Sequence, residues 1–371
     1  MQLTTRNPKA KLLLGPGPSN SDPRVLRAMS EPTLGHLDPD FVSIMDETTE
    51  LLRYVFDTKN KLTIPISGTG SAGMEAALVN SVEPGDKAII CTAGVFGDRM
   101  VDVAERAGAI VVKVEAPWGS PIDPEDVSNA IRKNPDAKMI GIVMAETSTG
   151  VLQPLDEIAN LAHSKGMRIV VDAVTSLGGM DVPTDRLSLD LVYSGTQKCL
   201  SCPPGLAPIT LNEKASAFVS ERKSKCRSWY LDLGMIQRYW GSERFYHHTA
   251  PINMIYAMHE ALLIVKEEGL ENRYRRHLGA QKDLIDGLGA MGMKMVVSPQ
   301  FRLPSLTTVY VPEGVDEGGV RKKLLLEHGI EIGAGLGVFK GKIWRIGTMG
   351  TNATHANVVH FLGALKDVLG R

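Results

Sequence analysis

Short apolar runs alternate with longer helical stretches up to about residue 193, and this alternation constrains the fold more than any other feature. The runs are rich in β-branched residues, while the segments between them repeat their apolar residues at helical spacing. Runs that are apolar on both faces suit strands of a parallel sheet covered by helices on each side. We therefore predict an α/β fold with strands at 62–66, 87–91, 109–114, 139–144, 168–172 and 189–193.

From about residue 251 the pattern changes to long helical stretches. Shorter strands are expected after them at 294–297, 306–311 and 343–347, with a helix near 320–328 and another at the end. A chain of 371 residues is too long for one average domain. We predict an N-terminal segment at 1–20, a large domain at 21–264 and a smaller α+β domain at 265–371.

The composition argues against a macromolecular partner. A formal net charge of -1 gives no general attraction to nucleic acid or to an anionic membrane. No run reaches the roughly 20 apolar residues that a membrane helix requires, and the N-terminus lacks the apolar core of a secretory signal. The few cysteines form no disulfide framework at this length, which favours a reducing compartment. We expect a cytoplasmic protein with a small-molecule partner.

Lys198 and Asp172 are the strongest candidate pair. Lys198 ends the sequence Gly195-Thr196-Gln197-Lys198 just after a predicted strand, and Asp172 ends the apolar strand before it. Ligands of open α/β sheets bind outside the carboxyl ends of the strands, so both side chains are expected at one crevice. A lysine desolvated there has a lowered pKa and an amine able to attack an aldehyde. Taken alone, each is more often structural, the lysine as a surface charge and the aspartate as a cap.

A glycine-rich turn, Ser67-Gly68-Thr69-Gly70-Ser71-Ala72-Gly73, joins the strand at 62–66 to a helix. Its spacing fits a dinucleotide fold, but the acidic residue expected about 20 positions later is missing, since the next strand ends in Cys91-Thr92. A monophosphate held by N–H groups at a helix N-terminus satisfies the pattern equally well. We expect phosphate binding here rather than a purely structural turn.

Three further features allow more than one interpretation. Cys199 and Cys202 have the spacing of redox and zinc sites, but no second pair accompanies them, so packing is expected. His247 and His248 are adjacent and face different ways, which favours a structural or ligand-loop role, and we predict no metal site. Arg345 lies in an apolar strand and needs a carboxylate, either a structural Asp or Glu or the α-carboxylate of a substrate.

These pieces occur in the order and spacing of a known family. The chain resembles the class V, fold-type I aminotransferases from about Leu12 to its C-terminus, and is most similar to their alanine:glyoxylate and serine:glyoxylate group. The motifs that carry the resemblance are Leu14-Gly15-Pro16-Gly17-Pro18-Ser19, Ile66-Ser67-Gly68-Thr69-Gly70, Glu146-Thr147-Ser148-Thr149-Gly150-Val151-Leu152, Val171-Asp172, Tyr193-Ser194-Gly195-Thr196-Gln197-Lys198, Tyr246-His247-His248-Thr249 and Gly269-Leu270-Glu271-Asn272-Arg273. The resemblance implies a seven-stranded, mainly parallel sheet and pyridoxal 5'-phosphate as the cofactor.

It also implies a role for each residue that matches a family motif. Lys198 would carry the cofactor as a Schiff base and shuttle a proton, Asp172 would hold the pyridine nitrogen protonated, and Arg345 would bind the substrate's α-carboxylate. The other implied cofactor contacts are Phe96 on the ring, Thr147 near the ring hydroxyl, Gly70, Ser71 and Gln197 at the phosphate, and Tyr246 and Thr249 reaching that phosphate from a second subunit. The implied assembly is a homodimer with shared active sites.

The implied reaction moves an amino group from alanine or serine to glyoxylate, giving glycine by a ping-pong mechanism. Other donors stay open, since enzymes for ureidoglycine, aminoethylphosphonate and phosphoserine share the fold. Cysteine desulfurases share it too, but they need a reactive Cys in the C-terminal half, and none follows Cys226.

Two departures from the family pattern bear on these expectations. Phe96 stands where the alanine:glyoxylate group often has Trp, which leaves the fit of ring and substrate open. The C-terminus, Val368-Leu369-Gly370-Arg371, has no peroxisomal address. Two distant alternatives are a cofactor-sensing regulator, which would need a DNA-binding domain before Gly15, and a nicotinamide dehydrogenase.

Overall fold

The structure, a computed structural model, describes residues 8–370. Its largest layer is a seven-stranded sheet in the order β2-β10-β9-β8-β5-β3-β4, in which only β10 runs antiparallel to its neighbours. This confirms the predicted α/β fold with a mainly parallel sheet. The strands are β2 (Leu62–Ser67), β3 (Lys87–Thr92), β4 (Ile110–Glu115), β5 (Met139–Val143), β8 (Arg168–Asp172), β9 (Leu191–Tyr193) and β10 (Leu206–Leu211).

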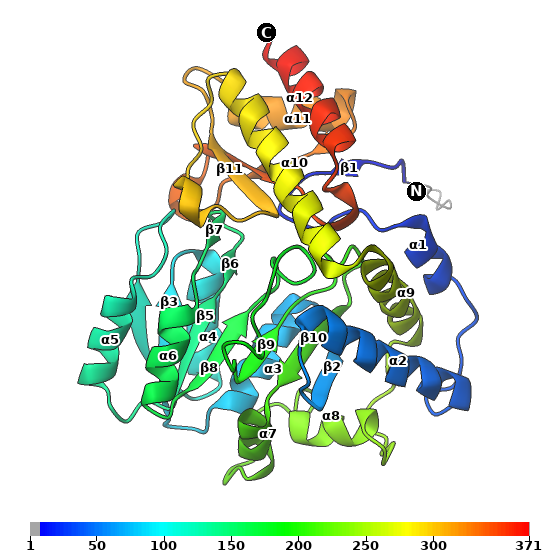
Figure 1. Ribbon diagram of the computed structural model, residues 1–371, viewed down its shortest axis with the longest axis vertical. Helices are drawn as coiled ribbons and strands as arrows, with labels where there is room; N and C mark the ends of the chain where they lie inside the picture. The colour runs from blue at the N-terminus through cyan, green and yellow to red at the C-terminus, as the bar shows by residue number, and fades with distance from the viewer. Residues whose placement is uncertain (1–7, 371) are drawn as a thin grey trace, which may run out of the picture.

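Helices cover both faces of this sheet because its central strands are apolar on both sides (Figure 1). Helices α3 and α4 contact each other behind the sheet in this view, and α5 and α6 contact each other in front of it. The helices of this layer are α1 (Pro23–Met29), α2 (Pro39–Phe56), α3 (Gly70–Ser81), α4 (Val95–Arg106), α5 (Pro124–Lys133), α6 (Asp156–Ser164), α7 (Glu213–Ser220), α8 (Leu233–Trp240) and α9 (Ile252–Glu268). A short hairpin of β6 (Ala145–Glu146) and β7 (Val151–Leu152) follows β5.

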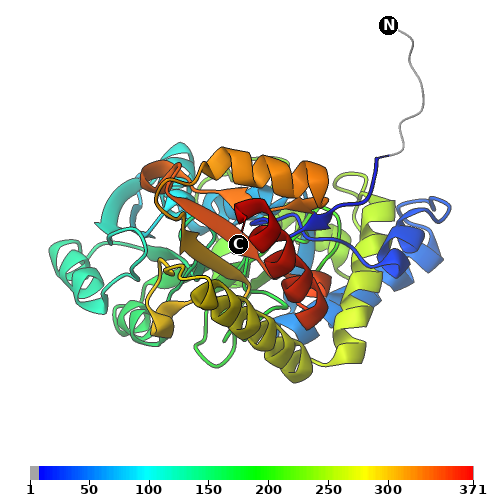
Figure 2. The ribbon, with the colours of Figure 1, turned by 90° about the horizontal axis from the view of Figure 1, so that it is seen from above.

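A smaller unit stands above the large sheet and has its own buried core, which includes Leu284, Trp344 and Phe361. It contains the antiparallel sheet β11 (Leu306–Tyr310), β14 (Ile343–Gly347) and β13 (Gly333–Ala334), with helices α10 (Leu270–Ala290), α11 (Glu317–Glu327) and α12 (His355–Leu369). Figure 2 looks down on this unit and shows α12 between α10 and α11. The division near residue 265 stays a prediction, and the junction of α9 and α10 at Gly269 lies close to it.

The N-terminal segment belongs to this smaller unit in space. Strand β1 (Leu12–Leu13) pairs in parallel with β12 (Ile330–Glu331), and Leu14 is buried in the small unit's core. The first seven residues of the predicted 1–20 segment lie outside the described residues. The described part of this segment therefore connects the two units, because α1 follows it and packs on α9.

Two details differ from the sequence prediction. The predicted strand at 294–297 is wrong, since this stretch makes only one isolated bridge, between Met295 and Val309. Strand β10 was not predicted, although it lies inside the large sheet. The long helical stretches expected from residue 251 are present as α9 and α10, which meet at Gly269, whose φ of +78° favours glycine.

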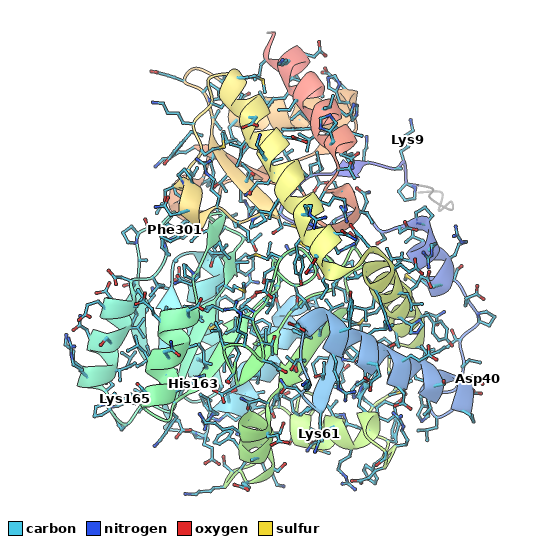
Figure 3. The ribbon with its side chains drawn as sticks, viewed as in Figure 1. Lys9, Asp40, Lys61, His163, Lys165 and Phe301 are labelled. Atoms are coloured by element: carbon cyan, nitrogen blue, oxygen red, sulfur yellow. The ribbon has the colours of Figure 1, made fainter. Side chains whose placement is uncertain are left out.

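Charged side chains are found on the surface of the molecule. The charged side chains of Lys9, Asp40, Lys61 and Lys165 all lie exposed at the periphery of the molecule (Figure 3). None of the helices within residues 8–370 combines the length and the apolar character needed to cross a bilayer.

Candidate active site

Asp172 is the last residue of β8 and lies beside Tyr193, its register partner at the end of the neighbouring β9. Its side chain is only 3% exposed. The carboxylate accepts hydrogen bonds from the Val174 amide and from the Tyr193 hydroxyl, each at 2.8 Å. Burial raises the pKa of Asp172 to about 6, because the charged form has lost its water. A cation placed opposite this carboxylate is therefore strongly favoured.

Lys198 lies in the loop that follows β9 and is 8% exposed. Burial, and then the positive charge of Arg345, lower the pKa of Lys198 to about 8. The amine donates a hydrogen bond to the Pro16 carbonyl. Gly17 has a φ of +101°, and a Cβ built on it would lie 2.5 Å from the Lys198 Nζ. The N-terminal segment thus covers the lysine so closely that only glycine fits there.

The two side chains line one cavity of about 150 Å³. Five more of the predicted site residues line the same cavity, namely Gly70, Ser71, Phe96, Thr147 and Gln197. The remaining wall includes Arg99, which the sequence analysis did not single out. The structure therefore brings seven of the ten predicted residues together around one small space at the carboxyl ends of the strands.

One end of the cavity suits an anion. It lies at the N-terminus of α3, where the Thr69 side chain makes no capping hydrogen bond, so the first amides of the helix are available to a ligand. Ser71 and Arg99 meet there, with 3.2 Å between the guanidinium and the hydroxyl. The buried Oε1 of Gln197 has no hydrogen-bond partner within the described residues. Rotation of this amide presents its NH2 group to the same space.

The Phe96 side chain also lines the cavity. Contacts around the start of α4 hold it in place. Glu146, 1% exposed, accepts hydrogen bonds from the Gly97 amide at the start of α4, at 3.3 Å, and from the Ser148 amide, at 3.0 Å. Burial raises the pKa of Glu146. The Arg99 guanidinium lies 4.8 Å from the centre of the Phe96 ring. These contacts fix the ring over the cavity.

Arg345 comes from β14 of the small unit and is 7% exposed. Its Nε donates to the Ala334 carbonyl at 2.6 Å, and its Nη1 donates to the Thr147 carbonyl at 3.2 Å. Within residues 8–370 it makes no ion pair with a carboxylate. Burial lowers the pKa of Arg345 to about 10, against the attraction of Glu146. The sequence analysis left two partners open for Arg345, a structural Asp or Glu or the α-carboxylate of a substrate. Within the described residues, no structural Asp or Glu pairs with it.

Tyr246 and Thr249 do not line the cavity of their own chain. Tyr246 is 48% exposed, and its hydroxyl lies 3.1 Å from that of Thr249. The loop that carries them is attached near the anion end, because His248 Nε2 lies 2.8 Å from the Ser67 hydroxyl at the end of β2. Both side chains are therefore presented outward, next to the site but not in it.

Cys199 and Cys202 are buried next to Lys198, and neither is paired. Burial raises the pKa of both thiols, so neither is a thiolate at neutral pH. The residues that the structure describes contain no group of three or more possible metal ligands. These cysteines pack, as the sequence analysis expected.

Four residues near the site were not identified from the sequence as functional candidates: Pro16, Arg99, Glu146 and Tyr193. Glu146 had a usable signal, since it follows an apolar strand in the same way as Asp172 does. The signal for Arg99 is weaker, because a lone arginine on a helix usually belongs to the solvated surface. Pro16 acts through its carbonyl group, and nothing in its side chain reveals that.

Comparisons with known proteins agree with this geometry. A family model described as "Aminotransferase class-V" matches residues 12–358. The chain is 41% identical to the (S)-ureidoglycine–glyoxylate transaminase of Bacillus subtilis, over 97% of this chain and 91% of that protein. It is 40% identical to the alanine–glyoxylate aminotransferase of Rattus norvegicus, over 97% and 87%.

Solved structures give the same answer. The alanine–glyoxylate aminotransferase of Nostoc sp. superposes with a TM-score of 0.97 at 46% identity, covering 100% of this chain and 98% of that one. A cysteine desulfurase from Thermococcus onnurineus shares the fold, with a TM-score of 0.76 at 18% identity. The resemblance inferred from the motifs is confirmed, and the chain belongs to the class V aminotransferase family.

Proposed function

We propose that this aminotransferase binds pyridoxal 5'-phosphate in the cavity between Lys198 and Asp172 and transfers the amino group of alanine or serine to glyoxylate. The single observation that carries the proposal is that this amine and this carboxylate line one small cavity. Such a pair matches the two ends of the cofactor, since the aldehyde takes an amine and the ring nitrogen takes an acid.

The residues present fit this cofactor. Its phosphate suits the N-terminus of α3, where uncapped amides, Ser71, the unpartnered amide of Gln197 and the Arg99 guanidinium converge. Its ring suits the space beneath Phe96, and Thr147 is available to the ring hydroxyl. Asp172 supplies the negative charge that a protonated ring nitrogen requires.

When bound, the cofactor withdraws electrons from the substrate's Cα, which makes the proton on that carbon acidic. Asp172 keeps the proton on the ring nitrogen, and Tyr193 keeps Asp172 in place through its hydroxyl. Lys198, whose pKa is near 8, takes the Cα proton and returns it. Arg345 binds the α-carboxylate, because it is a buried cation without a carboxylate partner among the described residues.

The same proposal includes a homodimer with shared active sites. It is supported by Tyr246 and Thr249, which are presented outward beside the phosphate end rather than into their own cavity. A second copy of the chain would contribute these hydroxyls to the phosphate. We also propose a cytoplasmic location, since a reducing compartment suits the unpaired cysteines.

Ureidoglycine is the second candidate donor. It is favoured by the Bacillus subtilis relative, whose 41% identity to this chain lies within one percentage point of the 40% of the Rattus norvegicus alanine–glyoxylate aminotransferase. Arg345 binds the α-carboxylate of either donor, so it does not discriminate between them. The acceptor, glyoxylate, is the same in both reactions.

Absorbance spectroscopy tests the cofactor and the donor together. The purified protein should have a visible band that each true donor bleaches in a half-reaction, and we expect alanine or serine to bleach it faster than ureidoglycine or phosphoserine. Lys198→Ala should lack the band, whereas Lys165→Ala, which changes an exposed lysine, should keep it. An unchanged spectrum in Lys198→Ala would refute the assignment of the lysine.

A further inference from the structure

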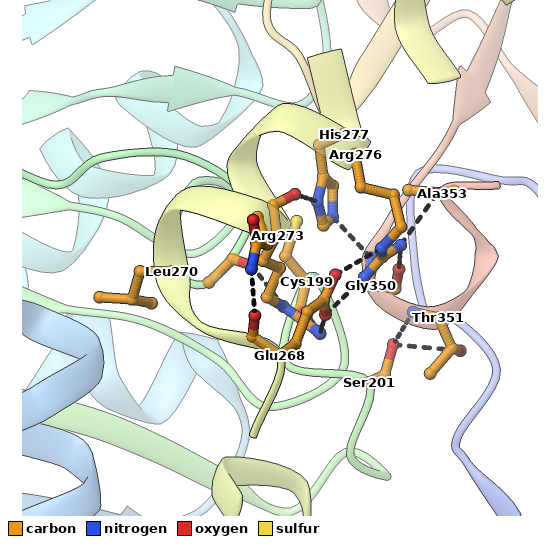
Figure 4. A network of polar contacts seen from close by, with 12 residues as sticks. Cys199, Ser201, Glu268, Leu270, Arg273, Arg276, His277, Gly350, Thr351 and Ala353 are labelled. Carbon is orange, nitrogen blue, oxygen red and sulfur yellow. Dashed lines mark hydrogen bonds and ion pairs between the residues drawn. The ribbon is translucent and has the colours of Figure 1, made fainter. Parts of the chain in front are cut away.

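The start of helix α10 lies between the loop that follows Lys198 and the turn that follows the Arg345 strand (Figure 4). The turn and the loop touch, since a Cβ on Gly350 would lie 1.8 Å from the Ser201 hydroxyl. The Thr351 amide also donates to that hydroxyl at 2.9 Å. The loop that follows Lys198 and the turn that follows β14 therefore meet at this helix.

Arg273 on α10 binds the loop that follows Lys198. Its side chain is only 1% exposed, and every nitrogen of its guanidinium donates a hydrogen bond. Nη2 donates to the Cys199 carbonyl at 2.6 Å, Nε to the Gly178 carbonyl at 2.8 Å, and Nη1 to the Glu268 carboxylate at 2.7 Å. Cys199 follows Lys198 directly, so the arginine fixes the backbone next to the lysine.

Arg276 and His277, one turn further along α10, bind the turn that follows β14 in the small unit. The Arg276 guanidinium binds Glu268 at 2.6 Å and donates to the Gly350 and Ala353 carbonyls at 2.8 and 2.9 Å. His277 Nε2 accepts from the Gly350 amide at 2.9 Å. Gly350 follows the end of β14 closely, and Arg345 is in the middle of that strand. These bonds therefore fix the position of the strand that carries Arg345.

The hydrogen bonds of His277 define its protonation. The Gly350 amide can only donate, so Nε2 carries no proton, and the Arg273 carbonyl, 2.8 Å from Nδ1, can only accept. His277 is therefore a neutral imidazole in one tautomer that joins α10 to the turn. A side chain of equal bulk without an acceptor leaves the Gly350 amide buried and unpaired.

We infer that Arg273 and His277 are positioning residues that set the spacing between Lys198 and Arg345, and with it the selectivity for substrates that carry an α-carboxylate. This rests on the proposed role of Arg345. An arginine clamp is productive only over a narrow range of positions, because a displacement of about 1 Å costs much of the rate. Network contacts that served stability alone would leave this selectivity unchanged.

The test compares two carbonyl reagents that differ only in a carboxylate, aminooxyacetate and O-methylhydroxylamine. Each is mixed with the holoenzyme, and the rate at which it bleaches the visible band is measured. The ratio of the two rate constants reports carboxylate positioning independently of turnover. We expect His277→Leu to lower this ratio by about tenfold, and His277→Gln, which keeps an acceptor, to restore much of it.

Two further variants complete the test. Arg273→Lys keeps the charge opposite Glu268 but cannot reach both carbonyls, so it should lower the ratio as His277→Leu does. His355→Leu is the matched control, because His355 is an exposed histidine that binds Asp283 at 2.7 Å outside the network. It should leave the ratio unchanged.

The outcomes separate the inference from the proposed function. If His277→Leu and Arg273→Lys lower the melting temperature but keep the wild-type ratio, or if Leu and Gln at position 277 behave alike, the positioning role is wrong. If the wild-type enzyme itself reacts equally fast with both reagents, the role proposed for Arg345 fails, and the inference fails with it.

Discussion

Lys198 should destabilise the cofactor-free protein at neutral pH. Its pKa is about 8 in the folded protein, against an ordinary value of 10.5. Each pKa unit corresponds to roughly 1.4 kcal/mol, so holding the charged amine in this buried position costs about 3 kcal/mol. Lys198→Met keeps a side chain of similar length without the charge, and should raise the free energy of unfolding by about that amount at pH 7.

The stability difference between Lys198→Met and wild type should depend on pH. Below pH 8 the lysine is protonated in both the folded and the unfolded protein, and the cost is fully present. Between pH 8 and 10.5 only the unfolded chain holds the proton, so wild-type stability rises relative to the variant. Above pH 10.5 both forms are neutral and the difference should vanish.

Urea unfolding of both cofactor-free proteins, at a series of pH values from 6.5 upwards, measures this difference directly. Effects of titrating groups that do not interact with Lys198 cancel in the comparison, whereas Arg345 and Asp172 do interact with it. If Lys198→Met is no more stable than wild type at pH 7, or if the gap stays constant between pH 8 and 10.5, the amine is not desolvated as the structure indicates.

Other variants should separate the remaining roles. Asp172→Asn should keep the bound cofactor but lower the rate of the half-reaction by about 100-fold or more, measured by stopped-flow absorbance. Arg345→Gln should raise KM for the amino acid by about 10- to 100-fold with little change in the cofactor spectrum, and an unchanged KM would place the carboxylate elsewhere. Arg99→Gln should weaken pyridoxal 5'-phosphate by about tenfold but not the unphosphorylated aldehyde, in equilibrium titrations. Mixing Lys198→Ala with Tyr246→Ala protein should restore activity in mixed dimers, because one site of each then has both residues, and no recovery would argue against shared sites.

Most strands of the large sheet were predictable because they carry an unambiguous apolar pattern, whereas β10 was missed. Pro208 stands in the middle of β10, and a proline inside a run argues against a central strand. Pro208 has no N–H to donate, but its carbonyl still accepts a hydrogen bond from the Ser194 amide at 2.8 Å. The stretch at 294–297 led to the opposite error, since Met295 packs against the core of the small unit but forms only one bridge, to Val309.

Some features of the candidate site were predictable from the sequence, and others were not. Asp172 and Lys198 were found because each combines a reactive side chain with a position after a strand. The enclosure of Lys198 was not predictable, because it depends on the backbone at Gly17 and Pro16, far away in the sequence. Local spacing predicts which side chains gather at a sheet edge, but not which distant segment covers them.

The pairing of β1 with β12 has a consequence for synthesis of the chain. A ribosome releases the segment from Leu12 to Gly17 early, yet its strand partner, Ile330–Glu331, emerges only near the end. The wall over the amine is thus held on one side by the far end of the chain and on the other by Ser19, whose hydroxyl donates to the Lys198 carbonyl at 2.7 Å. We therefore expect a chain that ends before Ile330 to lack one of the two attachments of this cover, while Ser19 still supplies the other.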